Sequence, residues 1–368
     1  MTFLVYLVLY SSCIFLATRT KVASLRSNGN IWNSYSVYLL LIVFALIVGT
    51  RYMVGKDYPG YMDIVQLGEA HYYYEHVEFI PRKLIDLVNA LDFEFYWWFI
   101  LMAFCQIFFI ARAVRGHLVK VFPWMIFVYL VLYLGFSMNV VRQGAALSCF
   151  LCAVTYAQER KLWPYLLFFF VGFLCHSSII VWLPTYWILS RELFPNIKVQ
   201  YLLLIASAFI LPPIIERLID ATRPYWELFG YGYQAENFTG EEEADVMGSG
   251  LGVILRYVRW SIIIAYYNKL KEYYGNNRFI IFYNLFFIGI CFDYSSMLNL
   301  HLSRVFMYGS FIEIIILSYL LYYLYRSRKE INVIIFIFLI ALLIVVPIYS
   351  IYSGGVEWKF VWDRLTYL

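Results

Sequence analysis

The stretch LYLGFSMNVVRQGAALSCFLCAV, residues 132–154, decides how the sequence is interpreted. Two apolar runs, each suited to the interior of a lipid bilayer, are separated by Arg142 and Gln143. A charged side chain in hydrocarbon costs a few kcal/mol or more unless another group solvates it. The stretch therefore predicts two membrane helices with a functional charge at their junction.

The composition of the whole chain supports this interpretation. Hydrophobic residues make up 63% of the 368 residues and charged residues only 14%. Apolar runs recur from the first residues to about residue 351, and no long polar block separates them. We expect an all-α, polytopic membrane protein with a single transmembrane domain, residues 1–368. The net charge of +4 comes from short basic breaks between apolar runs, a pattern that does not indicate a nucleic-acid surface.

Hydropathy predicts about twelve transmembrane helices. The positive-inside rule places the short basic loops in the cytoplasm, so both termini and two longer loops, 51–93 and 217–250, lie outside. Residues 163–189 fit either one tilted helix or two short ones that meet at His176. We choose two, because one span would send the later basic loops outside. The predicted helices cover residues 2–17, 36–50, 94–111, 122–137, 142–158, 162–175, 178–190, 199–216, 251–268, 279–292, 302–325 and 331–350.

Several arginines lie at the predicted outer ends of helices. Any one of them could anchor its helix to lipid phosphate. Together they suggest an anionic ligand, because a planar guanidinium donates two hydrogen bonds to a phosphate and stays charged. These residues are Arg51, Arg142, Arg256, Arg259 and Arg304.

Three acidic or histidine side chains lie in or near the predicted helices, and two of them are candidates for proton transfer. His176 interrupts an apolar run, and a histidine with a reference pKa of about 6.5 exchanges protons at physiological pH, although a core histidine bonded to a carbonyl is the alternative. Asp57 either acts in the site or pairs with Lys56 or caps a turn. Glu313 lies within an apolar run, where we expect a structural hydrogen-bond partner. The sequence contains no Cys or His spacing typical of a metal site and no Gly-rich phosphate loop.

Five segments together resemble the EpsG-type, Wzy-like polymerases of bacterial O-antigen, capsule or exopolysaccharide. In that family an R-x-x-x-G-x-D-x-x-x-Y segment, an R-Q pair before an Ala-rich helix and an H-x-S in the following hairpin recur in this order. The resemblance spans most of the chain, but it does not cover the loop 217–250 or the tail 353–368. The segments are RYMVGKDYPGY (51–61), VRQGAALS (141–148), ERK (159–161), FLCHSSIIVWLPTYWIL (173–189) and HLSRVFMY (301–308).

The resemblance implies a GT-C-type glycosyltransferase of the bacterial inner membrane whose active site faces the periplasm. It would transfer an oligosaccharide from undecaprenyl diphosphate to the non-reducing end of another lipid-linked repeat unit, without a metal or cofactor. A flippase and a chain-length regulator are the implied protein partners. Arg142 would bind the diphosphate and His176 or Asp57 would take the acceptor proton. The implied substrate-binding residues are Arg51, Tyr58, Tyr61, Gln143, Arg256, Arg259 and Arg304.

Two other function classes remain open at this point. One is a different membrane glycosyltransferase or acyltransferase, and the other is a flippase or transporter of the lipid-linked oligosaccharide. A transporter predicts two halves related by pseudo-symmetry and charges along a path to both faces. Here the unusual polar residues gather toward one face, which favours the polymerase.

Overall fold

The computed structural model describes residues 2–189, 191–228, 250–297, 300–353 and 358–362. The described chain is almost entirely helical, which confirms the all-α prediction apart from two strands of two residues each. It forms two compact units. Unit 1 comprises Met1–Tyr186 and Leu324–Leu368, and unit 2 comprises Trp187–Tyr323. The single transmembrane domain stays a prediction.

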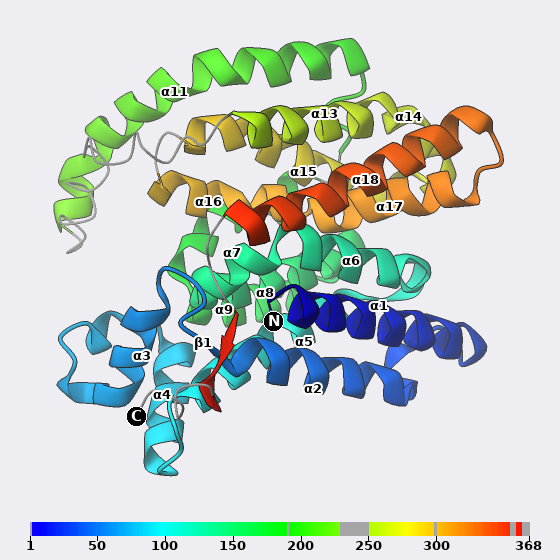
Figure 1. Cartoon of the computed structure of the whole chain (residues 1–368). Helices are drawn as coiled ribbons and strands as arrows, with labels where there is room; N and C mark the ends of the chain where they lie inside the picture. The colour runs from blue at the N-terminus through cyan, green and yellow to red at the C-terminus, as the bar shows by residue number, and fades with distance from the viewer. Residues whose placement is uncertain (1, 190, 229–249, 298–299, 354–357, 363–368) are drawn as a thin grey trace. The chain divides into compact units, whose positions relative to one another are not determined.

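Unit 1 is built around a buried helix, α8 (Val141–Gln158). Helix α8 contacts α5 (Tyr96–Ala113) and α9 (Leu162–Cys175), and α5 contacts α2 (Tyr35–Gly49). All residues from Gln143 to Ala157 are buried, and many are Ala, Ser or Cys, small residues that let helices approach closely in a membrane. Figure 1 shows α1 beside α2 in this unit. The other helices are α1 (Thr2–Arg26), η1 (Ile31–Asn33), η4 (Gly116–Val121), α6 (Phe122–Leu132), α7 (Leu134–Asn139) and α18 (Glu330–Ser353).

The predicted outer loop 51–93 has its own helical structure. It contains α3 (Tyr58–Leu67), η2 (Gly68–Ala70), η3 (Tyr74–His76) and α4 (Phe79–Ala90), which Figure 1 shows clustered at one end of unit 1. Prolines near the starts of α3 and α4 suit a first helical turn, where a backbone N–H is dispensable. These helices carry residues toward the N-terminal end of α8.

A two-stranded sheet joins the start of this segment to the C-terminal region. Strand β1 (Arg51–Tyr52) pairs antiparallel with β2 (Lys359–Phe360). The pairing continues where the N–H of Val361 donates to the carbonyl of Thr50 at 2.9 Å. Trp358 is buried, and its N–H donates to Oγ1 of Thr2 at 2.9 Å. Part of the tail that the family resemblance left unassigned is therefore a structural element of unit 1.

Residues 163–189 form a hairpin with His176 at its tip. Helix α9 ends at Cys175, and the chain returns through a 3-10 helix, η5 (Ser177–Trp182), and a short α10 (Thr185–Ile188). The Tyr165 hydroxyl donates to the carbonyl of Leu183 at 2.8 Å, which ties the returning chain to the start of α9. The hairpin is confirmed, but the predicted helix 178–190 is wrong, because the returning segment is mostly 3-10 helix and turn.

The helices of unit 2 match apolar runs, except for α14 (Tyr267–Tyr274), which is rich in Lys and Tyr. Helix α11 extends to residue 228, beyond the predicted end at 216, so the predicted loop 217–250 starts later, and its residues 229–249 lie outside the described residues. The predicted helix 302–325 is interrupted at Ile312. The elements are α11 (Ile197–Leu228), α13 (Leu251–Ala265), α14 (Tyr267–Tyr274), α15 (Asn276–Met297), α16 (Leu300–Phe311) and α17 (Glu313–Arg326), whose last residues belong to unit 1.

Helices α15 and α16 approach closely at Gly289. A Cβ atom at this position would lie 2.1 Å from the backbone N of Ser310, so only glycine fits without separating the helices. Such contacts between backbones are typical of membrane helix packing.

Four helical segments of the described chain are long and apolar enough to cross a bilayer, and four further apolar helices are shorter. The long ones are Thr2–Arg26, Tyr96–Ala113, Ile197–Ile214 and Arg304–Arg326. This is consistent with an all-α membrane protein, while the number of twelve spans and the GT-C architecture stay predictions.

Candidate functional site

Arg142 lies in the first turn of α8, where its guanidinium forms an ion pair with the carboxylate of Glu78. The rings of Tyr61 and Tyr73 lie beside it, with centroids 5.7 and 5.8 Å from Cζ. A carboxylate and two aromatic faces are the groups that solvate a guanidinium away from bulk water. The segment 51–93 therefore supplies the groups that solvate Arg142, the charge that interrupts the apolar sequence.

Glu78 also faces His176. One carboxylate oxygen, Oε2, pairs with Arg142, and the other, Oε1, lies 3.9 Å from Nε2 of His176. Three side chains that are far apart in sequence thus form one cluster, here called the Arg142–Glu78–His176 cluster. The structure thus brings the predicted catalytic residues Arg142 and His176 together through Glu78. The sequence pattern did not single out Glu78.

Helix α4 holds Glu78 in place. The indole N–H of Trp98 in α5 donates to the carbonyl of Pro81 at 3.0 Å, and Asn89 donates to the carbonyl of Val65 in α3 at 3.1 Å. Glu78 directly precedes α4, where the helix dipole favours a negative charge. An acidic residue shortly before Pro81 is a helix-start signal, so the sequence did carry a trace of this position.

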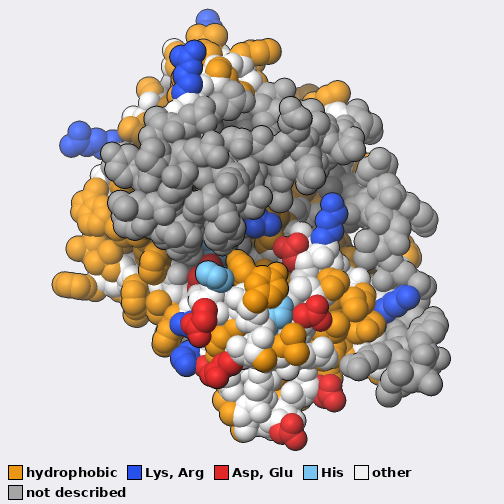
Figure 2. All heavy atoms as spheres, turned by 90° about the vertical axis from the view of Figure 1, so that its left-hand side faces the viewer, with side chains coloured by type: hydrophobic (Ala, Val, Ile, Leu, Met, Phe, Trp, Pro, Cys, Tyr) orange, Lys and Arg blue, Asp and Glu red, His pale blue; other side chains and the backbone are white. Residues whose placement is uncertain are grey.

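Acidic and histidine side chains are common on the surface around this segment. Figure 2 shows them interspersed with hydrophobic groups on the face to which α3 and α4 belong. One of them, Glu75, pairs with Arg82 at 2.7 Å and is 80% exposed. Glu78 differs from Glu75 because its side chain is 18% exposed and contacts residues of α8 and of the His176 hairpin.

His176 has one ring nitrogen engaged by its own turn. Nδ1 accepts from the backbone N–H of Ser178 and lies 2.8 Å from the Ser178 hydroxyl oxygen. An accepting Nδ1 carries no hydrogen, so a neutral imidazole holds its hydrogen on Nε2. We infer from this bonding pattern that the hydrogen on Nε2 faces Glu78.

Arg51 has a different environment from Arg142. Its side chain is fully buried, and its three nitrogens donate to the carbonyls of Val48, Val54 and Met138 at 2.7, 3.3 and 2.8 Å. The Tyr58 ring, 5.5 Å from Cζ of Arg51, contributes a cation–π contact. In this arrangement Arg51 joins the end of α2, the loop that follows it and the end of α7.

The other positions of the R-x-x-x-G-x-D segment fix the same junction. Gly55 has a φ of +110° and packs on the carbonyl of Met138, a conformation that favours glycine. The backbone N–H of Asp57 donates to Oδ1 of Asn139 at 3.1 Å. These contacts hold the segment against Met138 and Asn139, the second of which lies three residues before Arg142. The spacing of Arg51, Gly55 and Asp57 therefore reflects their shared contacts with this stretch of chain.

Tyr58, Tyr61 and Gln143 are enclosed rather than exposed. Tyr58 stacks on Phe99 with a centroid separation of 4.4 Å, and Gln143 is buried in α8. Burial raises the pKa of the Tyr61 phenol, and the nearby Asp57 also raises it, although Arg142 opposes the shift. Tyr61 therefore keeps its proton and can donate a hydrogen bond beside Arg142.

The remaining candidate arginines belong to unit 2. Arg256 pairs with Asp293 at 2.6 Å. Arg259 forms a bidentate pair with Glu313 at 2.5 and 3.0 Å, and both of these side chains are buried. Glu313 is thus a structural partner of Arg259, and a structural role for Glu313 is what the sequence led us to expect. Arg304 lies in α16. Arg256 and Arg259 each have a carboxylate partner on another helix, a pairing that the spacing of residues in the sequence does not indicate.

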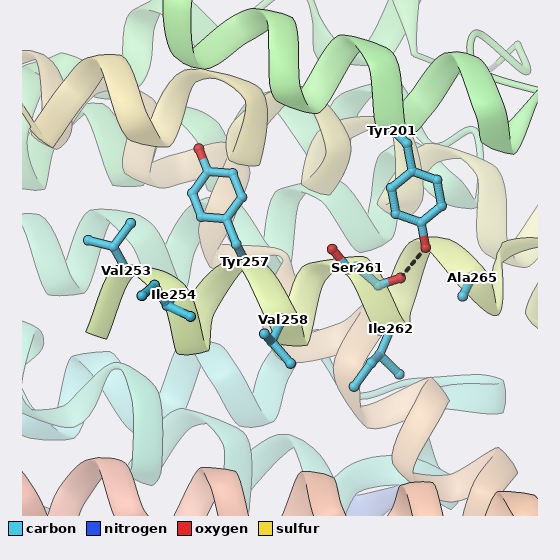
Figure 3. A pocket seen from close by; sticks show the side chains of 8 residues that line it. All are labelled: Tyr201, Val253, Ile254, Tyr257, Val258, Ser261, Ile262 and Ala265. Atoms are coloured by element: carbon cyan, nitrogen blue, oxygen red, sulfur yellow. Dashed lines mark hydrogen bonds between the residues drawn. The ribbon is translucent and has the colours of Figure 1, made fainter. Parts of the chain in front are cut away.

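Unit 2 also contains an apolar groove of about 620 Å³ along α13. Figure 3 shows Tyr201 reaching α13, where its hydroxyl donates to the carbonyl of Ser261 at 2.7 Å. The lining includes no charged side chain, so this groove does not supply a site for a diphosphate. Its lining residues are Tyr201, Val253, Ile254, Tyr257, Val258, Ser261, Ile262 and Ala265.

The chain matches one protein family over nearly its whole length. The EpsG family model covers residues 34–362, which include all five motif segments, the Arg142–Glu78–His176 cluster and the C-terminal strand. No curated protein and no solved structure matches the chain. From this match and the motif geometry, the chain belongs to the EpsG family, a family of Wzy-like polysaccharide polymerases.

Proposed function

We propose that this protein joins lipid-linked oligosaccharide repeat units at the outer face of the bacterial inner membrane. The donor is an oligosaccharide on undecaprenyl diphosphate, and the acceptor is the non-reducing end of a second lipid-linked unit. The family supports polysaccharide polymerisation of the Wzy type. The observation that carries the finer proposal is the Arg142–Glu78–His176 cluster, which combines a guanidinium with two groups that can hold or accept a proton.

Arg142 is the proposed ligand of the donor diphosphate. As the glycosidic C–O bond breaks, negative charge grows on the leaving diphosphate, and a fixed guanidinium stabilises this charge more in the transition state than in the ground state. Tyr61 is proposed to donate a hydrogen bond to the same group, and Gln143 to hold a phosphate or sugar oxygen. Because the donor sugar is bonded to a diphosphate, which is a good leaving group, the donor is already activated and no nucleotide is required.

The acceptor hydroxyl must lose its proton to a base in this site. The sequence offered His176 and Asp57 for this role. Asp57 lies close enough to Tyr61 to raise the pKa of its phenol, and His176 belongs to the cluster itself. A GT-C architecture, metal independence, and a flippase and chain-length regulator as partners belong to the same proposal.

The test uses purified protein and the lipid-linked repeat unit extracted from a host strain that lacks its polymerase. We expect a ladder of longer glycans that remain attached to the lipid, detected by gel electrophoresis and mass spectrometry. Substitution of Arg142 by Lys should be nearly as damaging as substitution by Ala, because Lys keeps the charge but loses the bidentate fork. The expected loss is roughly 100- to 1000-fold in rate, as for a removed oxyanion donor.

Matched amounts of folded variant protein serve as the control. Movement of the substrate across vesicles without any new glycosidic bond would support a flippase and contradict the proposal. Full-length polymer from the Lys variant at wild-type rate would contradict the diphosphate role and leave Arg142 as a structural partner of Glu78.

A further inference from the structure

We propose that Glu78 is the proton acceptor of the transfer and that the donor diphosphate activates it by taking Arg142 away from it. This inference rests on the proposed function and assigns a catalytic role to a residue that the motif segments do not include. In the absence of substrate, the ion pair between Glu78 and Arg142 keeps the site inactive, because the charge of each residue is neutralised by the other.

The geometry of the carboxylate supports a dual role. Oε2 of Glu78 is engaged by Arg142, while Oε1 faces Nε2 of His176 at 3.9 Å. All three side chains are only partly exposed, with 18% for Glu78, 13% for Arg142 and 19% for His176. Water and a substrate hydroxyl can therefore reach the cluster, yet its charges remain strongly coupled.

Arg142 is suited to an exchange of partners. One of its terminal nitrogens pairs with Glu78, while its Nε is buried and has no hydrogen-bond acceptor within the described part of the chain. A diphosphate carries more negative charge and more acceptor oxygens than a carboxylate, so it competes effectively for the guanidinium. Binding of the donor at the terminal nitrogens would weaken and then replace the contact with Glu78.

His176 then acts as a positioning residue. Since its Nδ1 accepts from the backbone of Ser178, its Nε2 hydrogen points toward Glu78 and holds the carboxylate once Arg142 has left. The separation of 3.9 Å is long for a hydrogen bond, as is common for catalytic contacts without substrate. A nitrogen that already carries hydrogen is a poor proton acceptor, which favours Glu78 over His176 as the base.

The step is balanced without a further reactant. The oxygen of the acceptor hydroxyl bonds to the anomeric carbon of the donor sugar, and its proton passes to Glu78. The bond between this carbon and the diphosphate oxygen breaks, and its electron pair stays on the diphosphate, which Arg142 holds. Glu78 later returns the proton to water, and undecaprenyl diphosphate leaves.

Glu78→Gln tests the role of Glu78 as proton acceptor separately from its contact with Arg142. The amide of Gln has the shape of the Glu carboxylate but cannot accept the proton. We expect tighter binding of undecaprenyl diphosphate, roughly 2- to 5-fold, since a competing carboxylate is removed. Turnover of the extracted lipid-linked repeat unit should fall about 100- to 10000-fold. Glu75→Gln, in the same segment but outside the cluster, is the matched control and should leave both quantities unchanged.

Two results would overturn the inference. One is normal turnover by Glu78→Gln, and the other is a parallel loss of binding and turnover, which would make Glu78 only a structural partner of Arg142. If the Gln variant does not fold, Glu78→Asp decides, because reduced kcat with retained binding supports the inference and reduced binding with normal kcat contradicts it. A failure of the proposed function is distinct, since the wild-type protein itself would then make no polymer.

Discussion

Substitution of Arg51 by Lys tests whether this arginine belongs to the scaffold or to the substrate site. Arg51 was a candidate ligand of the diphosphate, yet its three nitrogens already donate to three carbonyls contributed by three separate segments. Lys keeps the positive charge, but its single nitrogen cannot reach all three carbonyls from the directions that the guanidinium uses.

The expected loss follows from these contacts. At least one carbonyl at this junction would lose a charged donor, and each such bond contributes about 1.5–3 kcal/mol. Because Arg51 is fully buried, water cannot replace the donor without opening the packing against Phe99. For one or two bonds lost, the midpoint of thermal unfolding should fall by roughly 3–15 °C.

The assay combines thermal unfolding in detergent with binding of undecaprenyl diphosphate at a temperature well below the lowered midpoint. We expect a lower midpoint and unchanged binding per folded molecule. Arg82→Lys is the matched control, because Arg82 forms an exposed pair with Glu75 in the same segment and such pairs contribute little. An unchanged midpoint with lost binding would refute the scaffold role and return Arg51 to the diphosphate site.

Three other predictions concern the mechanism, the packing and the topology. His176→Gln keeps an N–H donor toward Glu78, so its rate should fall far less than that of Glu78→Gln, and a loss of 100-fold or more would make His176 the base. Gly289→Ala should cost about 1–3 kcal/mol or more in detergent unfolding, since its Cβ would lie 2.1 Å from a backbone N, whereas Gly252→Ala, with open space around it, should not destabilise the protein. In a cysteine-free background, an impermeant thiol reagent on intact spheroplasts should label Glu75→Cys but not Lys329→Cys, and the reverse result would invert the predicted topology.

The candidate site could be predicted from the sequence only in part. Arg142 stood out because a charge between apolar runs is expensive, and His176 stood out for the same reason. Glu78 lies 64 residues from Arg142 in a polar segment where acidic residues are common, so the composition of this segment does not single out Glu78. Only the folding of that segment into α3 and α4 brings the carboxylate to α8.

For the fold, hydropathy likewise predicted the positions of most helices but neither the structure of the returning segment 177–188 nor the ion pairs between helices. Apolar runs located most helices, because burial in lipid or protein demands apolar side chains in either case. Hydropathy did not show that residues 177–188 return mainly as 3-10 helix and turn, since this depends on hydrogen bonds such as that from Tyr165 to Leu183. It also treated Arg256 and Arg259 as free cations, because their partners Asp293 and Glu313 lie on other helices.

The pairing of β1 with β2 has a consequence for biosynthesis. Residues 51–52 leave the ribosome long before their strand partners, residues 359–360. The segment that carries Arg51 therefore lacks its strand partner while the intervening helices are made. A nascent or truncated chain that lacks residues 359–360 can insert these helices while the scaffold beside Arg142 remains incomplete, so synthesis itself delays the assembly of the site until β2 has been made.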